Sequence, residues 1–465
     1  MNKKSNDNEN PFATVWILLK STAYKQLMLL LLLGLQAQYA TGYDFMEGGI
    51  AYNINPDGKS VTVTYQHSVE YNTPSYSNAS GSLSIPASVK HGAITYSVTS
   101  IGYRAFYNCS GFTGTLTIPN SVTAIGSEAF SCCSGFTGSL TIPNSVTIIG
   151  SSGFYCCSGF TGSLTIPNSV TTIGYYAFLG CSGFTGSLTI GNSVTEIGSA
   201  AFSGCSGFTG SLTIPNSVTT IDILAFKGCS GFTGSLTIPN SVTEIDGGTF
   251  WGCSGFTGSL TIPNSVTFIG EMAFYCCSGF TGVLTIPNSV TEIVGGAFRN
   301  CSGFTGSLTI PNSVTTIDDM TFAGCSGITE IIVGNSVTAI GDSVFSRCNL
   351  KEITIPASVR SLGHGILRGN QISKITCLAK RPPTAFEQTD DDSGTFNGID
   401  RKNCFVYVPT GYDQSYWTAT GWKEFENIIE INPVPEVRGD LDGNGVVDID
   451  DLNTIINIML GKESQ

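Results

Sequence analysis

The sequence predicts a β-rich solenoid built from coils of 24 residues. The unit CSGFTGSLTIPNSVTEIDGGTFWG, at residues 229–252, recurs with small changes from Cys109 to about Cys348. Repeat periods of about 20–29 residues with spaced Leu and Ile are typical of proteins in which each unit is one coil stacked on the next. No segment within a unit is long enough for an ordinary helix, so we expect short strands, with short turn or 3₁₀ segments on the convex side.

Each unit carries large apolar residues in fixed columns. Leu occurs at position 116 and every 24 residues to 308, with Ile two residues later and Val four residues after that. One Phe column runs from Phe106 to Phe322, and a second runs from Phe112 to Phe304. The six large apolar side chains of a coil contribute about 9–18 kcal/mol on burial, whereas ordering each residue costs about 1.5 kcal/mol. One coil is therefore unstable alone, and stacking must supply the difference.

The SLTI stretch of each unit alternates polar and apolar residues. This pattern predicts a short strand with Leu and Ile inward and with Ser and Thr outward. Pro follows at once, as at Pro119 and Pro143, and ends the regular ladder because it has no N–H donor. Asn-Ser and Gly-Phe-Thr-Gly then supply the turns at the corners of the coil.

The repeated units resemble the BspA-like class of bacterial leucine-rich repeat, whose pattern joins a strand, Ile-Pro, Val, Ile-Gly, Ala-Phe and Cys. The resemblance covers about residues 80–375. The sequence departs from the family pattern at Gly191 and Gly334, which replace Pro, and in the last coils, which are shorter. The resemblance implies a leucine-rich-repeat-type solenoid in a secreted or surface protein that serves binding and adhesion and has no enzymatic activity.

Both ends of such an array need a cap, because an open end exposes apolar surface and strand edges. We assign residues 43–80 to an N-terminal β cap, in which GIAYNI and SVTVTYQ are strands joined at residues 55–58. The solenoid is assigned to 81–378, with SLSIP as its first strand and 89–97 as an enlarged turn. Residues 379–431 are expected to form a C-terminal cap module of strand and short helix, followed by a linker at 432–437.

Residues 1–42 are predicted to be a signal peptide. Basic residues precede the apolar run Leu27–Leu35, and small residues follow at Ala37, Ala40 and Gly42. A membrane anchor is the alternative, but the run is too short to span a bilayer. We therefore expect an exported protein, extracellular or at the cell surface, with no transmembrane segment after signal cleavage.

Charge and motif content exclude several functions. Charged residues make up 12% of the chain and the net charge is −13, a balance that disfavours nucleic-acid binding. The three His residues match no metal or triad spacing, and no Ser lies in a nucleophile elbow. The sequence therefore predicts a protein that is not an enzyme.

Eleven of the sixteen Cys form one column from Cys109 to Cys348. We expect buried free thiols there, because free Cys behaves as a small apolar residue. Bridges between stacked coils are the alternative, since the stacking distance permits them. Two further pairs are candidate disulfides, namely Cys132 with Cys156 in neighbouring coils and Cys377 with Cys404.

The tail at 438–463 contains a loop with calcium-ligand spacing. A Ca²⁺ ion takes about six to eight oxygen ligands, and positions 1, 3, 5, 7, 9 and 12 of such a loop supply them. The candidate ligands are Asp440, Asp442, Asn444, the Val446 carbonyl, Asp448 and Asp451. The tail resembles one half of a type I dockerin, which implies a cohesin-like partner, although dockerins carry two halves. A solvated acidic tail is the alternative, and a gain of helix on calcium addition would distinguish them.

The slots around Ala-Phe vary between units, while the rest of the unit barely changes. If their side chains point outward, the 24-residue recurrence aligns them along one edge, and exposed aromatic residues with Arg are typical of interface hot spots. The plain alternative is unconstrained variation at solvent turns. The candidate partner-binding residues are Tyr103, Arg104, Tyr107, Tyr175, Tyr176, Lys227, Trp251, Tyr275 and Arg299.

Three functions fit these features. The first is a secreted or cell-surface binding and adhesion protein that uses the solenoid as a platform for an extracellular protein or glycan. The alternative is a structural or scaffolding component, docked to another assembly through its calcium-binding tail. A third uses the outward Thr column, from Thr117 to Thr309, as the ligand surface.

Overall fold

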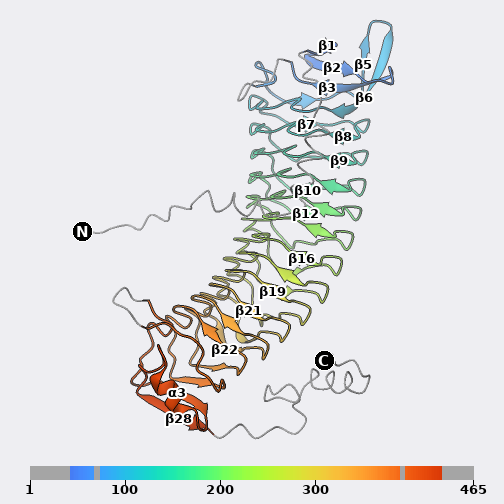
Figure 1. The fold of residues 1–465 in the computed structure, drawn as a ribbon. Coiled ribbons are helices and arrows are strands. Elements are labelled where there is room, and N and C mark those ends of the chain that lie inside the picture. The colour runs from blue at the N-terminus through green and yellow to red at the C-terminus, as the bar shows by residue number, and fades with distance from the viewer. Residues whose placement is uncertain (1–41, 67–73, 388–392, 432–465) are drawn as a thin grey trace, which may run out of the picture.

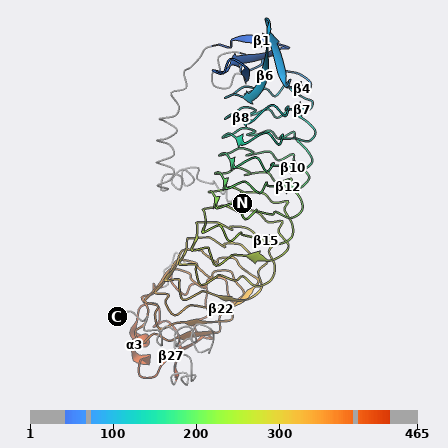
Figure 2. The same ribbon diagram turned by 90° about the vertical axis from the view of Figure 1, so that its right-hand side faces the viewer.

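The protein is an elongated, curved β-solenoid. The computed structural model describes residues 42–66, 74–387 and 393–431. The chain forms about 14 turns whose equivalent positions are about 24 residues apart, with almost no helix. The coils stack from the N-terminal to the C-terminal end of a bent rod (Figure 1), and the bend is also visible from the side (Figure 2). The predicted fold class is therefore confirmed.

The N-terminal cap is a small antiparallel region placed on the first coil. Strands β1 (Phe45–Glu47), β2 (Ile50–Ile54) and β3 (Ser60–Thr64) pair antiparallel. Asp57 Oδ1 closes the turn between β2 and β3 by accepting from the Lys59 and Ser60 N–H groups at 2.9 Å. The strands predicted on either side of this turn are confirmed.

A hairpin joins this cap to the array. Strand β5 (Ser88–His91) pairs antiparallel with β6 (Ile94–Ile101), and β6 pairs parallel with both β3 and the next coil. The sequence interpretation of 89–97 as an enlarged turn was wrong. Its alternating residues form the two strands of the hairpin, and Gly92, at φ +61°, makes the tight turn between them.

Two columns of short parallel strands run along the rod. The Leu-Thr column, which the sequence predicted, contains strands of two to five residues. Its strands are β4 (Leu83–Ser84), β7 (Leu116–Thr117), β10 (Leu164–Thr165), β12 (Leu188–Thr189), β15 (Leu236–Thr237), β17 (Leu260–Thr261), β20 (Gly306–Thr309), β22 (Ile328–Ile332), β24 (Glu352–Ile355) and β26 (Lys374–Cys377). Leu164 pairs with Leu188 and Thr165 with Thr189, so equivalent residues stack in register and the Thr side chains face outward.

A second strand column lies at the residue that precedes Gly, Asp or Val in each unit, which is Ile in all but the last of these strands. Its strands are β8 (Ala124–Ile125), β9 (Ile148–Ile149), β11 (Thr172–Ile173), β13 (Glu196–Ile197), β14 (Thr220–Ile221), β16 (Glu244–Ile245), β18 (Phe268–Ile269), β19 (Glu292–Ile293), β21 (Thr316–Ile317), β23 (Ala339–Ile340) and β25 (Ser361–Leu362). From β6 to β14 they form one unbroken parallel sheet that continues the cap. The second residue of each of these strands is buried and the first faces solvent.

The core between the strand columns contains stacked aromatic rings. In one column the ring centroids of Phe130 and Phe154 lie 5.2 Å apart, and in the other those of Phe136 and Phe160 lie 5.6 Å apart. The columns meet edge to face, with Phe130 and Phe136 6.3 Å apart. The Gly before the second Phe allows this spacing, because a Cβ at Gly135 would lie 2.2 Å from the Ser110 carbonyl of the preceding coil. Stacking thus buries the apolar columns that a single coil would expose.

The Cys column lies inside this core as free thiols. All eleven members are buried and unbridged, as predicted. Cys133 Sγ lies 2.9 Å from the Phe106 carbonyl oxygen, and Cys229 Sγ lies 3.1 Å from that of Phe202, so each thiol donates to the preceding coil. Burial raises the pKa of Cys253 to about 12. The column therefore behaves as apolar filling with a weak donor.

The C-terminal residues extend the solenoid. Strands β27 (Phe405–Pro409) and β28 (Asn427–Ile431) continue the sheet of β24 and β26, and α3 (Asp413–Thr418) lies between them in sequence. Trp422 closes the core, with its Nε1 donating to the Pro383 carbonyl at 2.9 Å. The predicted strand and short helix are present, and β27 stacks directly on the array.

This register argues against the Cys377–Cys404 disulfide. Phe405, next to Cys404, pairs with Lys374, and Cys377 lies three residues further along β26. At about 3.3 Å per residue the two Cys are roughly 13 Å apart along the strands, beyond the approximately 7 Å Cα limit for a bridge. Both are buried free thiols, and the Tyr416 hydroxyl lies 3.2 Å from Cys377 Sγ.

Candidate functional site: the Ala-Phe edge

The third side of each coil is the Ala-Phe segment, which contains no strand. Here the backbone N–H groups donate alternately to a carbonyl of the next coil and to a carbonyl of the same segment. Arg104 N donates to Ser127 O of the next coil at 3.1 Å, whereas Tyr107 N closes a turn onto Arg104 O at 3.1 Å. Two residues per coil take positive φ, at the positions of Arg104 and Asn108 in the first unit. The segment buries Ala and Phe and turns the side chains that flank them outward, forming an edge that we call the Ala-Phe edge.

The first predicted cluster lies at the N-terminal end of this edge. The Arg104 guanidinium carbon is 5.2 Å from the Tyr103 ring centroid and 4.6 Å from that of Tyr107. Its Nη2 also pairs with Glu128 Oε2 of the next coil at 2.8 Å. Tyr103 is 52% exposed, while Arg104 is half-buried. Arg104 therefore orders the two rings, and its own charge is balanced by Glu128.

Tyr175 and Tyr176 form a second group on the same edge. Tyr176 takes φ +57° and is exposed, and Tyr175 beside it is half-buried. Tyr155, one coil earlier, also lies on the edge, beside Cys156, and sequence reasoning missed it. Cys132 and Cys156 are half-buried free thiols at equivalent positions of neighbouring coils. A bridge between them stays a prediction.

The remaining four predicted residues form a continuous ladder, which we call the cation–aromatic ladder. Lys227 Nζ lies 4.0 Å from the Trp251 ring centroid, Trp251 meets Tyr275 edge to face at 5.2 Å, and the Arg299 guanidinium lies 5.6 Å from Tyr275. Each residue is 24 positions from the next, so four successive coils each contribute one side chain. Each such cation–ring contact contributes about 0.5–1 kcal/mol at an exposed site, so the ladder holds its members in place.

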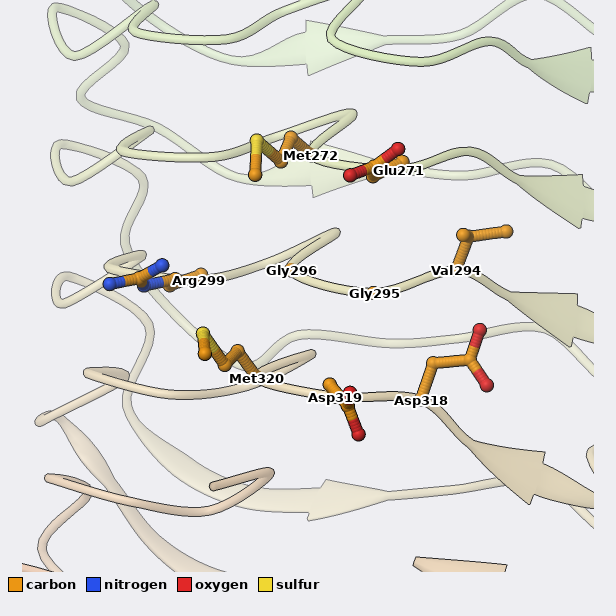
Figure 3. A pocket seen from close by; sticks show the side chains of 9 residues that line it. All are labelled: Glu271, Met272, Val294, Gly295, Gly296, Arg299, Asp318, Asp319 and Met320. Carbon is orange, nitrogen blue, oxygen red and sulfur yellow. The ribbon is translucent and has the colours of Figure 1, made fainter. Parts of the chain in front are cut away.

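A hollow of about 360 Å³ opens beside the Arg299 end of the ladder. Gly295 and Gly296 form its floor because they carry no side chains, while the flanking coils carry Met272 and Met320 at the position of Gly296 (Figure 3). The two methionines and Arg299 lie toward one end, and Glu271, Asp318 and Asp319 lie toward the other. Burial, followed by the charges of Asp319 and Glu292, raises the pKa of Asp318.

Sequence reasoning missed this hollow. A Gly-Gly pair between two units that carry Met at the same position was the available signal. The hollow combines apolar thioethers with charges of both signs, which suits recognition of a polar partner surface.

The repeat region matches a known family. Residues 86–209, 147–258, 207–305 and 257–374 each match the BspA type leucine rich repeat region (6 copies), and together these matches cover more than half of the chain. This chain belongs to the BspA-type leucine-rich repeat family. A comparison with curated proteins gives no significant match.

A solved structure shows the same fold. A leucine-rich repeat protein from Bacteroides ovatus is similar to this BspA-type chain at 27% identity and a TM-score of 0.61, covering 84% of this chain and 100% of its own. A leucine rich cell surface protein from Faecalibacterium prausnitzii aligns over 83% and 94% of the two chains, at 22% identity and a TM-score of 0.38. The pneumococcal vaccine antigen PcpA aligns over 83% and 98%, at 15% identity and a TM-score of 0.45.

The remaining predicted sites lie elsewhere. The calcium loop, from Asp440 to Asp451, lies outside the described residues, and calcium binding stays a prediction. Within the described ranges, no group of three or more His, Cys, Asp or Glu side chains is placed to hold a metal ion. Across these same ranges, no helix combines the length and apolar character needed to cross a bilayer. Of the histidines, His364 stacks on Phe386 at 3.8 Å and contacts Asp342 at 3.2 Å.

Proposed function

We propose that this BspA-type protein is an exported binding and adhesion protein without enzymatic activity, and that its extracellular protein or glycan ligand contacts the Ala-Phe edge. The observation that carries the proposal is the cation–aromatic ladder. In an otherwise uniform array, four variable side chains on successive coils contact one another rather than pointing separately into solvent. Mutual contact fixes their rotamers, so a partner would lose little side-chain freedom on binding them.

The chemistry of the ladder supports this assignment. Trp, Tyr and Arg are the residue types that contribute most to binding interfaces, because they combine large contact area with directed polar groups. At about 4.8 Å per coil, the ladder from Lys227 to Arg299 is roughly 14 Å long and continues into the hollow. The outward Thr column offers only small side chains, such as Thr165 and Thr189, which suit weak and repetitive contact.

The experiment is a screen of the full chain against extracellular-matrix proteins and glycans, followed by titration of each ligand found. The double variant Trp251→Ser with Tyr275→Ser should weaken binding at least about tenfold, which corresponds to about 1.4 kcal/mol. The melting temperature should fall only slightly, because both side chains are half-buried outside the stacked core.

A matched control removes two exposed apolar side chains away from the edge. Ile148, in β9, is 54% exposed, and Val283, before the Leu-Thr column, is 55% exposed. The double variant Ile148→Ser with Val283→Ser should bind as the unaltered protein does. Equal affinity of the two double variants would refute the proposal and direct attention to the Thr column.

The tail belongs to a separate part of the proposal. The loop spacing from Asp440 to Asp451 supports one bound Ca²⁺ ion, and a cohesin-like partner would then attach the rod to another assembly. Edge binding and tail binding are independent, because the former uses residues of the repeat array alone.

A further inference from the structure

A second, smaller hollow of about 200 Å³ lies on the Ala-Phe edge, next to the first. Arg299 and Met320 line both hollows. Three arginines line the second hollow, which we call the arginine hollow. Among the described residues, its polar lining consists of Arg299, Asn300, Ser343, Ser346, Arg347 and Arg368 and includes no Asp or Glu. The charged side chains that line this hollow in the described part of the chain are therefore all positive.

Positive charge is scarce in the regular repeats. Between residues 106 and 350 there are eleven Asp and Glu but only three Lys and Arg, which are Lys227, Arg299 and Arg347. Two of these three line the arginine hollow, and Arg368 of the next coil is a third arginine in its lining. In a protein of net charge −13, such an arrangement attracts anions locally.

Arg347 occupies a backbone position that disfavours it. Its φ is +55°, and the equivalent residue of the preceding coil, Gly324, and of the following coil, Gly369, is Gly. A non-glycine residue in this left-handed region costs about 1–2 kcal/mol. A Cβ at Gly369 would lie 3.1 Å from Arg347 Cγ, so the missing side chain at Gly369 leaves room for the Arg347 stem. The local backbone thus accommodates a strained Arg that points toward the hollow's lining.

We propose that the arginine hollow binds a single anionic group, a sulfate ester or a carboxylate, carried by the ligand of the Ala-Phe edge. Guanidinium groups pair with such oxyanions through two parallel N–H bonds, and the Ser343 and Ser346 hydroxyls can donate further bonds. The hollow is smaller than the roughly 300–1,000 Å³ of sites that enclose a whole drug-sized molecule. The anionic group therefore anchors a larger ligand that extends along the ladder, so this inference rests on the proposed binding role.

The test measures small anions directly on the full chain. Ligand-observed NMR titrations with methyl sulfate, sodium glucuronate and uncharged glucose should show saturable binding of one or both anions and none of glucose. The two anions distinguish a sulfate ester from a carboxylate. Arg347→Gly and Arg299→Gln should each weaken anion binding at least fivefold, and Arg347→Gly should not lower the melting temperature because Gly suits the backbone there.

Lys351→Gln is the charge-matched control, since Lys351 is exposed outside the hollow and should leave anion binding unchanged. Unaltered affinity in Arg347→Gly and Arg299→Gln, or glucose binding as tight as methyl sulfate binding, would overturn the inference. The single variant Trp251→Ser separates this result from the proposed function, because in the described geometry of the ladder Trp251 contacts neither Arg299 nor the hollow. Its loss should weaken binding of the large ligand while keeping the small anion. If no anion binds while that variant still loses the large ligand, only the arginine hollow is refuted.

Discussion

Backbone conformation at single residues explains which side chains the Ala-Phe segment accepts. The second left-handed position of each coil holds Gly in about half of the units, Asn at 108 and 300, and Cys at 132, 156 and 276. Small or locally hydrogen-bonding residues tolerate this conformation best. The preference for Gly or Asn at this position was visible in the sequence, but the positive φ that causes it was not. Arg347 is recognised as an exception only once its positive φ is known.

Asp246 should make the free energy of unfolding depend on pH. Burial, followed by the charges of Asp222 and Glu244, raises the pKa of Asp246 to about 7, whereas an unfolded Asp titrates near 3.9. The folded state therefore holds this proton more tightly. Protonation of Asp246 stabilises the folded state fully below about pH 4, and this stabilisation is lost as pH rises toward about 7.

Asp246→Asn should remove this loss. Compared with the unaltered protein, the variant should be more stable at pH 8 by roughly 1–3 kcal/mol and equally stable at pH 4. Thermal melts at pH 4, 6 and 8 measure the difference. The exposed Glu330→Gln should show the same pH profile as the unaltered protein, and a parallel profile for Asp246→Asn would contradict the assignment.

At the scale of elements, two glycines of one unit serve different purposes. Gly252 has φ +72°, and a Cβ there would lie 3.8 Å from its nearest neighbour, the Gly228 Cα. Gly255 has an ordinary φ, but its Cβ would lie 2.1 Å from the Ser230 carbonyl oxygen. Position 252 requires a left-handed backbone conformation, whereas position 255 requires two coils to approach each other closely.

Gly252→Ala should therefore destabilise the protein by about 1 kcal/mol through backbone strain alone. Gly255→Ala should cost more, because two stacked coils must separate and the rigid backbone cannot yield as a side chain would. Differential scanning calorimetry of both variants measures the two melting temperatures. A smaller loss for Gly255→Ala than for Gly252→Ala would contradict the account of coil stacking.

Elements with their own local pattern were predictable from sequence, and the others were not. The hairpin around Asp57 combined alternating strands with a strong turn, and α3 with its flanking strands showed a similar change of pattern. The second strand column contains strands of two residues, such as β8 and β11, which are too short to show alternation. Pairing between coils, rather than local propensity, creates these strands.

At the scale of the whole molecule, exact recurrence predicted the candidate site only where the period was constant. The 24-residue spacing placed Lys227, Trp251, Tyr275 and Arg299 in one column, and the structure brings them into contact. The same column continues through Ala323, Ser346 and Arg368, where the spacing falls to 23 and then 22 residues. Arg347 and Arg368 were missed for this reason. The hollow at Gly295 was missed because it depends on absent side chains.

Hydroxyl-radical footprinting of the full chain, with and without a ligand from the binding screen, tests the central claim most directly. Trp, Tyr and Met side chains are oxidised readily when exposed, so the edge carries its own reporters in Trp251, Tyr275 and Met320. Trp417 and Tyr412, each 36% exposed in the C-terminal region, provide internal references. The proposed binding mode predicts that the ligand protects the three edge residues and leaves the two references unchanged. Protection confined to Trp417 and Tyr412, with the edge oxidised as before, would contradict it.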